Sequence, residues 1–361
     1  MEPLLFQEVR DLRLPRAEQQ VGGVYFEASP HDAWRANLEL RTAIRVLRRL
    51  ARFTAPHADA LYAGVQEIDW SSWIGLDATF AIEAQTRDSQ LDHSMFVGQR
   101  TKDAIVDQLR ERHGRRPTVD RDDPDLRLHV HLSRDRATIS VDTSGPSLHK
   151  RGWRVAQGTA PLAETLAAAI LLHSEWDRRA PLIDPFCGSG TILIEAALLA
   201  SGTAPGLSRP EFAFERFPGH DETAWTRLRD EAWERVRPLG KLRLLGYESD
   251  PRIADMARAN VEAAGFAESI EIVTGDGLGA EWKSGWGAWV VTNPPYGERV
   301  GESAAIDELY RRLAAKTVEA GDSYRFALLC GNPALGAALP EGRFRSLPLQ
   351  NGGIACDLHL A

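Results

Sequence analysis

The chain has little cysteine, no long apolar run and no excess of positive charge. Its 361 residues include only 3 cysteines, and these lie far apart. Three scattered thiols are too few for a disulfide framework or a zinc site. Because no run of about eighteen apolar residues occurs, no membrane span is expected, and the N-terminus lacks the features of a signal peptide. These absences favour a cytoplasmic protein that needs neither a membrane nor a metal.

The net charge of −8 argues mildly against a nucleic-acid partner, because proteins that bind nucleic acids usually have basic surfaces. The distribution of the charges weakens this objection. Residues 1–155 hold about 23 basic and about 23 acidic side chains, so the acidic excess lies in the rest of the chain. The N-terminal part is therefore neutral overall, with local clusters of arginine.

The N-terminal third mixes helical and strand-like patterns. Apolar residues recur at helical spacing from Asp32 to Ala51, which predicts one long helix, and a second helix is expected over Thr101–Arg112. Alternating or apolar runs predict four short strands, at Gly23–Glu27, Thr79–Gln85, Leu126–Leu132 and Ala137–Asp142. The first helix has a basic face that could contact phosphates or simply be solvated, made by Arg41, Arg45, Arg48 and Arg49. This mixture is typical of small α+β modules.

The C-terminal part shows a regular alternation of short apolar runs and helical sequence. The runs predict strands at Leu182–Asp184, Leu242–Glu248, Ile270–Thr274, Trp289–Thr292 and Tyr324–Cys330. Such an alternation is typical of a parallel sheet with helices on both faces. Ligands of these sheets bind outside the carboxyl ends of the strands, so the residues directly after each run deserve most weight.

A glycine-rich turn follows the first of these runs. It reads Asp184-Pro185-Phe186-Cys187-Gly188-Ser189-Gly190-Thr191 and leads into a helix that contains Glu195. Glycine allows a tight turn and close approach of a ligand to the backbone. No Gly-Lys-Ser/Thr follows, which excludes a Walker phosphate loop. The carboxylate of Asp184 favours a ligand with a cationic group, such as the aminoacyl end of S-adenosylmethionine.

Two further acids follow the next two strands. Glu248 ends the second run, and a carboxylate at this place commonly accepts hydrogen bonds from two ribose hydroxyls. Asp276 follows the third run and could accept a hydrogen bond from an adenine amino group. Each acid taken alone could be an ordinary cap at a strand–helix turn. Three acids after three consecutive strands, together with the glycine turn, favour a nucleoside cofactor.

The fourth run is followed by Asn293-Pro294-Pro295-Tyr296. An exocyclic amine of a nucleobase is a poor nucleophile, because its lone pair is delocalised into the ring. The Asn293 side-chain oxygen and the Pro294 carbonyl could accept hydrogen bonds from that amine. The two prolines stiffen the backbone, and Tyr296 could stack on a base that has left its helix. The motif therefore predicts methylation of an amino nitrogen without a metal.

At this point the sequence resembles a known family. Residues 184–296 resemble class I methyltransferases that act on amino nitrogens, and nearly the whole chain is similar to bacterial 23S rRNA guanine-N2-methyltransferases with a THUMP domain. The narrower match rests on stretches outside the generic motifs, namely Thr101–Asp107, Ser144–Arg154 and Leu349–Ile354. The resemblance implies a Rossmann-like class I methyltransferase domain preceded by α+β ferredoxin-like and THUMP modules. The expected boundaries are 1–60, 61–150 and 151–361, with an insert near 201–240.

The resemblance also implies roles for individual residues. Asn293, Pro294, Pro295 and Tyr296 are expected to hold the target guanine. The residues expected to bind S-adenosylmethionine are Asp184, Phe186, Gly188, Gly190, Thr191, Glu195, Glu248, Ser249, Asp276, Gly277 and Asn293. The residues expected to contact RNA are Lys102, Arg115, Arg116, Lys150, Arg151 and Arg154.

Two departures from the family and several alternative functions complete these expectations. Relatives usually have a strand before Leu4, so the first module is expected either to be incomplete or to have a misassigned start. Some relatives carry a second methyltransferase that makes 7-methylguanine, and this second activity is expected to be absent here. The nearest alternative is a tRNA guanine-N2-methyltransferase, and a different class is a non-catalytic RNA-binding assembly factor. Adenine N6 in DNA or glutamine in a protein would suit the same Asn-Pro-Pro-Tyr chemistry, but the THUMP-like segment argues against both.

Overall fold

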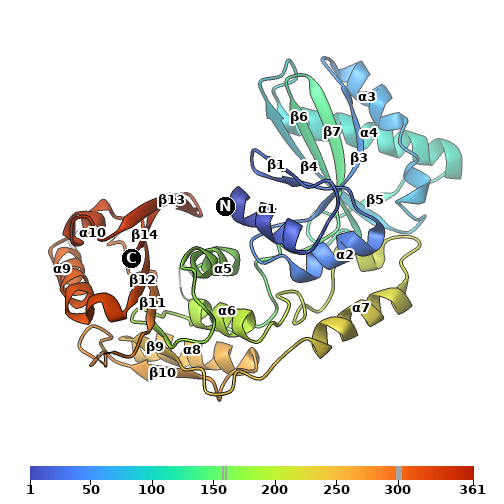
Figure 1. Ribbon diagram of the computed structural model, residues 1–361. Coiled ribbons are helices and arrows are strands. Elements are labelled where there is room, and N and C mark those ends of the chain that lie inside the picture. Colours follow the sequence, from blue (N-terminus) through green and yellow to red (C-terminus); the bar gives the residue numbers. More distant parts are fainter. Residues whose placement is uncertain (157, 159–160, 284, 298–302) are drawn as a thin grey trace.

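The computed structural model describes residues 1–361 except 157, 159–160, 284 and 298–302. Two sheets of five and seven strands are each covered by helices and lie apart in the molecule (Figure 1). A small N-terminal module lies beside the five-stranded sheet. No helix among the described residues combines the length and the apolar character needed to cross a bilayer.

The N-terminal module holds two helices and a short hairpin, α1 (Glu2–Asp11), β1 (Glu18–Gln20), β2 (Gly23–Tyr25) and α2 (Pro30–Glu39). Ser29 caps α2, because its hydroxyl accepts from the Asp32 amide while the Asp32 carboxylate accepts from the Ser29 amide. This reciprocal pair satisfies two backbone donors that the first turn leaves free. The helix therefore begins at a sharply defined point.

The long helix predicted over Asp32–Ala51 is wrong. The α2 helix ends at Glu39, and residues 47–54 form strand β3 of the five-stranded sheet. The Glu8 carboxylate of α1 accepts from the backbone amides of Arg41 and Thr42, so these donors do not continue the helix. Ile44, which the helical pattern counted as apolar, is 61% exposed. Pairing of β3 with β7 therefore outweighs the local helical pattern.

The five-stranded sheet has the order β3-β7-β6-β4-β5. Strand β4 runs parallel to β6, whereas β6 and β3 both run antiparallel to β7. Helices α3 and α4 share a buried core with one face of this sheet. The elements are β3 (Leu47–Thr54), α3 (Ala58–Gln66), η1 (Trp70–Ser72), β4 (Thr79–Arg87), α4 (Ser94–His113), β5 (Thr118–Val119), β6 (Leu126–Ser133) and β7 (Arg136–Asp142). The strands and the helix predicted here from apolar periodicity are confirmed.

The seven-stranded sheet has the order β10-β9-β8-β11-β12-β14-β13. The first five strands run parallel, β14 runs antiparallel to them, and β13 runs antiparallel to β14. Strand β9 lies on one side of β8, and strand β11, which comes later in the chain, lies on the other side. The strand order therefore reverses at β8. Ligands of doubly wound sheets bind at such a reversal. The strands are β8 (Leu182–Asp184), β9 (Leu244–Glu248), β10 (Ile270–Thr274), β11 (Trp289–Thr292), β12 (Arg325–Cys330), β13 (Arg345–Asn351) and β14 (Ile354–Leu360).

Helices cover both faces of this sheet, as Figure 1 shows. One buried core joins the sheet to α5, α6 and α8, and a second core joins its other face to α9 and α10. The helices that cover the sheet are α5 (Glu164–His173), α6 (Thr191–Ala200), α8 (Pro251–Ala263), α9 (Ser303–Ala320) and α10 (Pro333–Ala338), and η3 (Gly321–Ser323) is a 3-10 turn after α9. Helix α7 (Glu222–Glu234) and the 3-10 turn η2 (Ala213–Arg216) belong to the insert. The helix-covered parallel strands predicted from the alternation are confirmed, and so is the Rossmann-like class I methyltransferase domain that the resemblance implied.

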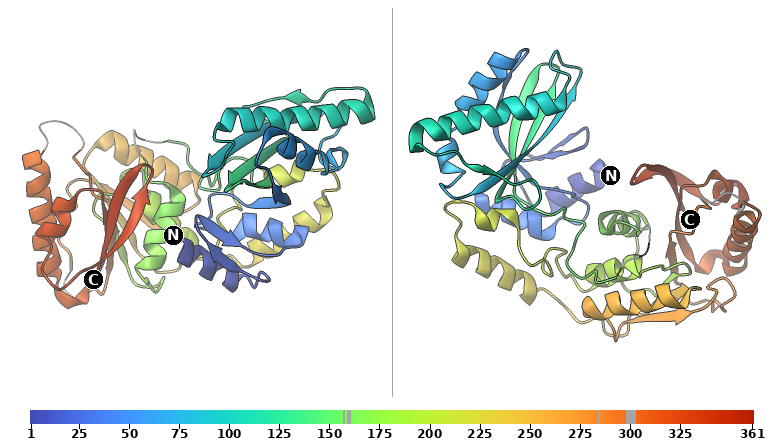
Figure 2. Two further views of the ribbon diagram at one scale, coloured as in Figure 1. Left: turned by 90° about the horizontal axis from the view of Figure 1, so that it is seen from above. Right: turned by 180° about the vertical axis from the view of Figure 1, so that it is seen from behind.

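The insert predicted near 201–240 carries η2 and α7 and packs against the N-terminal module (Figure 2). A third buried core joins Trp34 and Leu38 of α2 to Phe212, Phe214 and Trp225 of the insert. The rings of Phe214 and Trp225 meet edge to face, with their centroids 4.9 Å apart. The two halves of the chain therefore share apolar packing, and removal of the first half would expose it to water.

Candidate functional site

The carboxyl ends of four neighbouring parallel strands bring the predicted cofactor residues to one edge of the sheet. Asp184 at the end of β8 pairs in register with Gly246 of β9, and Glu248 of β9 pairs with Thr274 of β10. The amide of Cys187 donates to the Tyr247 carbonyl at 2.9 Å, so the glycine turn lies directly beside the end of β9. The expectation that these strand ends form one site agrees with the sheet order.

The turn between β8 and α6 needs glycine at two places for different reasons. Gly188 and Gly190 both have positive φ, at 52° and 84°. Apart from its chain neighbours, no atom of the described residues lies within 4 Å of where a Gly188 Cβ would be, so this position faces open space among them. A Cβ at Gly190 would lie 3.6 Å from that of Ala257 on α8. The first glycine thus leaves room for a ligand, and the second allows the left-handed turn beside α8.

A third glycine, Gly277, allows the loop after β10 to pack closely against the backbone of Pro185. A Cβ at this position would lie 2.6 Å from the Pro185 carbonyl oxygen, closer than van der Waals contact allows. The loop after β10 therefore passes directly over the glycine turn. Phe186, also predicted at this site, is half-buried in the same turn and packs against the core beneath α9 and α10.

Asp184 is a buried carboxylate at the centre of the site, 1% exposed. Its Oδ1 accepts from the Thr292 hydroxyl at 2.6 Å and from the Phe186 amide at 3.2 Å. Burial raises the pKa of Asp184 to about 7, against the lowering effect of these two hydrogen bonds. No hydrogen bond from the described residues reaches Oδ2. Asp184 therefore suits a cationic donor that would stabilise its ionised form.

The other two acids have different surroundings. Glu248 is half-buried, and its Oε1 accepts from the Asp250 amide at 2.9 Å and from the Ser249 hydroxyl at 3.4 Å. Asp276 forms an ion pair with Arg312 of α9, whose hydrogen bond is the main cause of the lowered pKa of Asp276. Glu248 keeps a free oxygen for a ribose among the described contacts. Asp276 is already engaged by a protein cation.

Two residues predicted to bind the cofactor have structural partners instead. Glu195 is 1% exposed and faces the guanidinium of Arg151, with Nε and Oε1 3.1 Å apart. Its carboxylate is therefore directed into the interior, and the predicted cofactor contact of Glu195 is wrong. Thr191 is buried, and its hydroxyl accepts from Arg154 at 2.8 Å. The position of a side chain within the first two turns of α6 is therefore not enough to assign it to a ligand.

The Asn293–Tyr296 segment is held by two side chains from other parts of the chain and by one hydrogen bond of its own. The Tyr310 hydroxyl of α9 donates to the Pro295 carbonyl at 2.8 Å, and Asn332 before α10 donates to the Tyr296 carbonyl at 3.0 Å. The Tyr296 hydroxyl donates to the Asn293 Oδ1. Sequence reasoning missed Tyr310 and Asn332, because neither stands in a recognisable motif. Their contacts fix the backbone carbonyls of the predicted amine-binding segment.

The ring of Tyr296 is half-buried between two parts of the fold. A Cβ on Gly331 would lie 3.0 Å from the ring, and Asn351 of β13 donates to the Tyr296 hydroxyl at 3.3 Å. Burial raises the pKa of the Tyr296 hydroxyl well above its ordinary value, so it stays a hydrogen-bond donor. The hydroxyl thus orients the Asn293 amide with its oxygen toward Tyr296. Base stacking by Tyr296 stays a prediction.

The six residues predicted to contact RNA divide into two groups. Arg115, Arg116 and Lys150 are exposed, and Lys102 is half-buried beside Asp103. Arg151 is 1% exposed, so its predicted RNA contact is wrong. Arg154 is mostly buried and bonds the glycine turn, so the same prediction is wrong for it. Arg41, which one reading assigned to phosphate, is also enclosed and donates to the Thr203 carbonyl at 2.6 Å.

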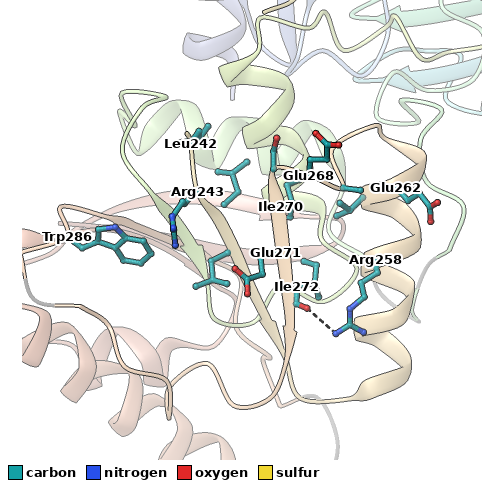
Figure 3. A pocket seen from close by; sticks show the side chains of 14 residues that line it. Leu242, Arg243, Arg258, Glu262, Glu268, Ile270, Glu271, Ile272 and Trp286 are labelled. Atoms are coloured by element: carbon teal, nitrogen blue, oxygen red, sulfur yellow. Dashed lines mark hydrogen bonds between the residues drawn. The ribbon is translucent and has the colours of Figure 1, made fainter. Parts of the chain in front are cut away.

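A groove of about 630 Å³ lies away from this site, along the sheet edge formed by β9 and β10 (Figure 3). Its lining comes from the amino-terminal halves of these strands, from α8 and from Trp286. The guanidinium of Arg258 donates a hydrogen bond to the Ile272 carbonyl oxygen at 3.0 Å. Ligands of parallel sheets bind at the opposite, carboxyl end, so we assign no ligand to this groove. Among the described residues no three His, Cys, Asp or Glu side chains gather as metal ligands.

Three family models match consecutive parts of the chain. A model described as "RMKL-like, methyltransferase domain" matches residues 151–359. A THUMP domain model matches residues 55–142, and an RlmL ferredoxin-like domain model matches residues 1–47. These matches confirm the three kinds of module expected from the sequence. The exact boundaries of the modules stay a prediction.

Full-chain relatives carry the name ribosomal RNA large subunit methyltransferase K/L. The Pseudomonas aeruginosa protein is 40% identical over 369 residues, which cover 99% of this chain and 51% of that protein. The Pseudomonas entomophila protein is 40% identical over 369 residues, which cover 100% of this chain and 50% of that protein. The chain thus spans about half the length of the curated relatives it matches.

Solved structures of similar length share the fold along the whole chain. The SMU.472 protein, crystallised with SAH, is 31% identical with a TM-score of 0.88 and covers 99% of this chain and 94% of its own. A possible methylase from Clostridium difficile 630 is 31% identical with a TM-score of 0.90 and the same coverage. TrmN from Thermus thermophilus, at 20% identity and a TM-score of 0.73, covers 99% of this chain and 95% of its own and shares the fold.

Proposed function

The chain belongs to the family of RMKL-like methyltransferase domains, and on this premise we propose that it methylates the exocyclic N2 amine of a guanine in 23S rRNA, with S-adenosylmethionine as the methyl donor. The observation that carries the proposal is the meeting of Asp184, Glu248 and Asn293 at the carboxyl edge of one parallel sheet. The K/L name of the relatives supports a large-subunit rRNA substrate.

The residues present suit this cofactor. Gly188 has open space where a side chain would be, Asp184 Oδ2 has no protein partner among the described residues, and Glu248 has a free carboxylate oxygen. We assign the aminoacyl ammonium to Asp184 and the ribose hydroxyls to Glu248. When bound, S-adenosylmethionine supplies an electrophilic methyl group. The SAH complex of a protein 31% identical to this chain supports the choice of cofactor.

The Asn293 segment would bind and polarise the target amine. Asn293 Oδ1 already accepts one hydrogen bond from Tyr296, and an amide oxygen has a second lone pair for an N–H donor. The Pro294 carbonyl would accept the other N–H. Acceptors placed on both N–H groups return electron density to the nitrogen, and they favour the transition state because its N–H groups become more acidic. Tyr310 and Asn332 donate to the carbonyls of Pro295 and Tyr296, and so hold the backbone directly after these acceptors.

The proposal predicts methylation of protein-poor 23S rRNA by the full chain in the presence of EDTA. A guanine N2 in a finished ribosome is usually paired and packed, and flipping it out costs a few kcal/mol. Transfer of labelled methyl groups should therefore be faster to protein-poor 23S rRNA than to assembled large subunits. Nucleoside digestion and mass spectrometry should find N2-methylguanine.

The same assay separates the alternatives. Efficient labelling of tRNA but not of 23S rRNA would support the tRNA enzyme instead. N6-methyladenine as the product would support a different base, in line with the description of a 31% identical Listeria monocytogenes protein as a predicted N6-adenine-specific DNA methylase. No transfer to any RNA would support a non-catalytic assembly factor. Loss of activity in EDTA would contradict the expectation that no metal is needed.

We propose that the exposed basic residues contact RNA, namely Lys102, Arg115, Arg116 and Lys150. The double replacement of Arg115 and Arg116 by alanine should weaken RNA binding about tenfold at low salt, because each cation that neutralises a phosphate releases a counterion. The slope of log affinity against log salt should shrink by about 1–2 in magnitude. Filter binding at several salt concentrations measures both quantities.

Arg311 on α9 gives a matched control for this double variant. It is 68% exposed and paired with Glu308, much as Arg115 is 64% exposed and paired with Asp77. The R311A variant should bind RNA as the unchanged protein does. R311A removes one charge and the double variant removes two. A loss in R311A half as large, on a logarithmic scale, as the loss in the double variant would therefore show that only general charge, and no RNA contact of Arg115 or Arg116, is involved.

The proposal also includes the predicted module boundaries at 1–60, 61–150 and 151–361. A cytoplasmic location follows from it as well, since ribosomal RNA is made and processed there in bacteria.

A further inference from the structure

Arg154 makes an unusual set of contacts around the glycine turn. Its side chain is 14% exposed and forms an ion pair with Glu164 at the start of α5, at 2.8 Å. Two of its guanidinium nitrogens donate to the hydroxyls of Ser189 and Thr191, at 2.9 Å and 2.8 Å. These two hydroxyls flank Gly190. A planar guanidinium thus bonds the turn on both sides of its second glycine.

The backbone next to Arg154 is fixed to the same turn through Asn260 of α8. This side chain is 0% exposed, and its oxygen accepts from the amides of Val155 and Ala156 at 3.0 Å and 2.9 Å. Its nitrogen donates to the Ser189 carbonyl at 3.1 Å and to the Ala156 carbonyl at 2.8 Å. Arg154 therefore reaches the turn from a backbone that is itself held in place.

The chain before Arg154 is anchored in the interior. Arg151 pairs with Glu195 and donates to the Leu148 carbonyl at 2.8 Å. Arg209, from the insert, donates to four carbonyls of the segment between β7 and Arg151. The segment that leaves the five-stranded sheet is thus rigid up to the point where it meets the glycine turn.

We propose that Arg154 is a positioning residue that holds the glycine turn in the conformation that receives the methyl donor. A turn with two positive-φ glycines has many accessible backbone conformations, and a free turn would lose this freedom on binding. The hydrogen bonds of Arg154 to Ser189 and Thr191 restrict the turn before the ligand arrives. This inference rests on the proposed function, because it takes the turn to be the cofactor site.

Replacement of Arg154 by methionine keeps the length of the side chain and removes the donors. The R154M variant should bind S-adenosylmethionine about tenfold more weakly, since hydrogen bonds of a charged group that pre-organise a site are worth about a factor of ten. The Michaelis constant for RNA should stay within about twofold, and kcat at saturating cofactor should fall less than the affinity. Calorimetry on the full chain gives the affinity, and R154K should recover part of it.

A matched control is R343M. Arg343 is likewise partly buried and donates to two carbonyls, those of Thr317 and Gly321, at 2.7 Å and 2.6 Å. It lies by α9 and η3, away from the turn. Cofactor affinity should be unchanged in R343M. If both variants lose affinity equally, the loss reflects general destabilisation and the positioning role of Arg154 is rejected.

Deuterium exchange without cofactor decides the same point independently. Amides of the turn, residues 187–191, should exchange faster in R154M than in the unchanged protein, while amides of β12 should not change. If R154M fails to fold, the double variant S189A/T191V removes the same hydrogen bonds and leaves the Arg154–Glu164 pair intact. Unchanged exchange and affinity in these variants would overturn the inference. Absence of cofactor binding by the unchanged protein would instead reject the proposed function, while the exchange data would still report on the turn.

Discussion

Replacement of Asn293 by alanine is expected to lower kcat for methyl transfer about 10²–10³-fold, the range seen when one preorganised polar group is removed from an active site. The reason is that Asn293 Oδ1 would accept a hydrogen bond from the target amine that strengthens as the nitrogen acquires positive charge. The affinity for S-adenosylmethionine should change little, because Asp184 and Glu248 would supply the assigned cofactor contacts. Single-turnover methyl transfer and calorimetry on the same preparation measure the two effects.

The aspartate variant of Asn293 provides the control. N293D keeps an acceptor oxygen for the amine and for the Tyr296 hydroxyl, so it should retain far more activity than N293A. Near-normal turnover of N293A would show that Asn293 is not the amine acceptor. Loss of cofactor binding in N293A would show that Asn293 contributes to binding of S-adenosylmethionine, and not mainly to the transition state.

The second large effect is expected for Asp184→Asn. An amide can still accept from Thr292 and from the Phe186 amide, so the local hydrogen bonds are kept. It cannot pair with a cation, and loss of a charge-assisted hydrogen bond should weaken binding of S-adenosylmethionine about 10–100-fold. In the unchanged protein, affinity should rise from pH 6 to pH 8, as Asp184 ionises with a pKa of about 7. The D184N variant should lack this pH dependence.

The same substitution should change the stability of the protein without its cofactor. The pKa of Asp184 is about 7 in the folded chain against 3.8 as its ordinary value, so the folded state holds this proton more tightly than the unfolded state. The unfolding free energy therefore falls as the pH rises from about 4 to about 7, by roughly 4 kcal/mol from this group. D184N removes this loss and should be the more stable protein at pH 8.

Urea midpoints at pH 5 and pH 8 test the stability effect. The gap between D184N and the unchanged protein should be larger at pH 8. Asp177 serves as the control, because the amides of Ala180 and Arg179 lower its pKa, so its charge does not change between these two pH values. The urea midpoint of D177N should differ from that of the unchanged protein by the same amount at pH 5 and at pH 8. Equal urea midpoints of D184N and the unchanged protein at pH 8 would mean that ionisation of the Asp184 carboxylate does not lower the unfolding free energy.

The sequence by itself determined the five parallel strands of the seven-stranded sheet and the edge at which the candidate site lies, but not the antiparallel pair β13 and β14. The runs at Leu182–Asp184, Ile270–Thr274 and Trp289–Thr292 coincide with β8, β10 and β11. The inner strands β8 and β11 are buried and almost wholly apolar, whereas the edge strand β10 is only partly buried and carries Glu271. The ends of all three are marked by Gly, Pro, Asp or Asn. Asp184, Glu248 and Asn293 follow directly, because the polarity of parallel strands alone brings their carboxyl ends together.

Tertiary structure alone decided which long side chains face a ligand and which face one another. Arg151, Arg154 and Glu195 stand in or beside motifs, yet they bond the interior and the glycine turn rather than RNA or cofactor. The helical pattern of residues 32–51 gave way to α2 and β3 for a related reason, since Glu8 and β7 supply the partners for that backbone. A buried charge or an open backbone donor needs a partner, and that partner usually comes from a distant part of the chain. The local sequence therefore predicts the strand, helix or turn in which a residue lies. The packing of the whole fold determines which partner its side chain contacts.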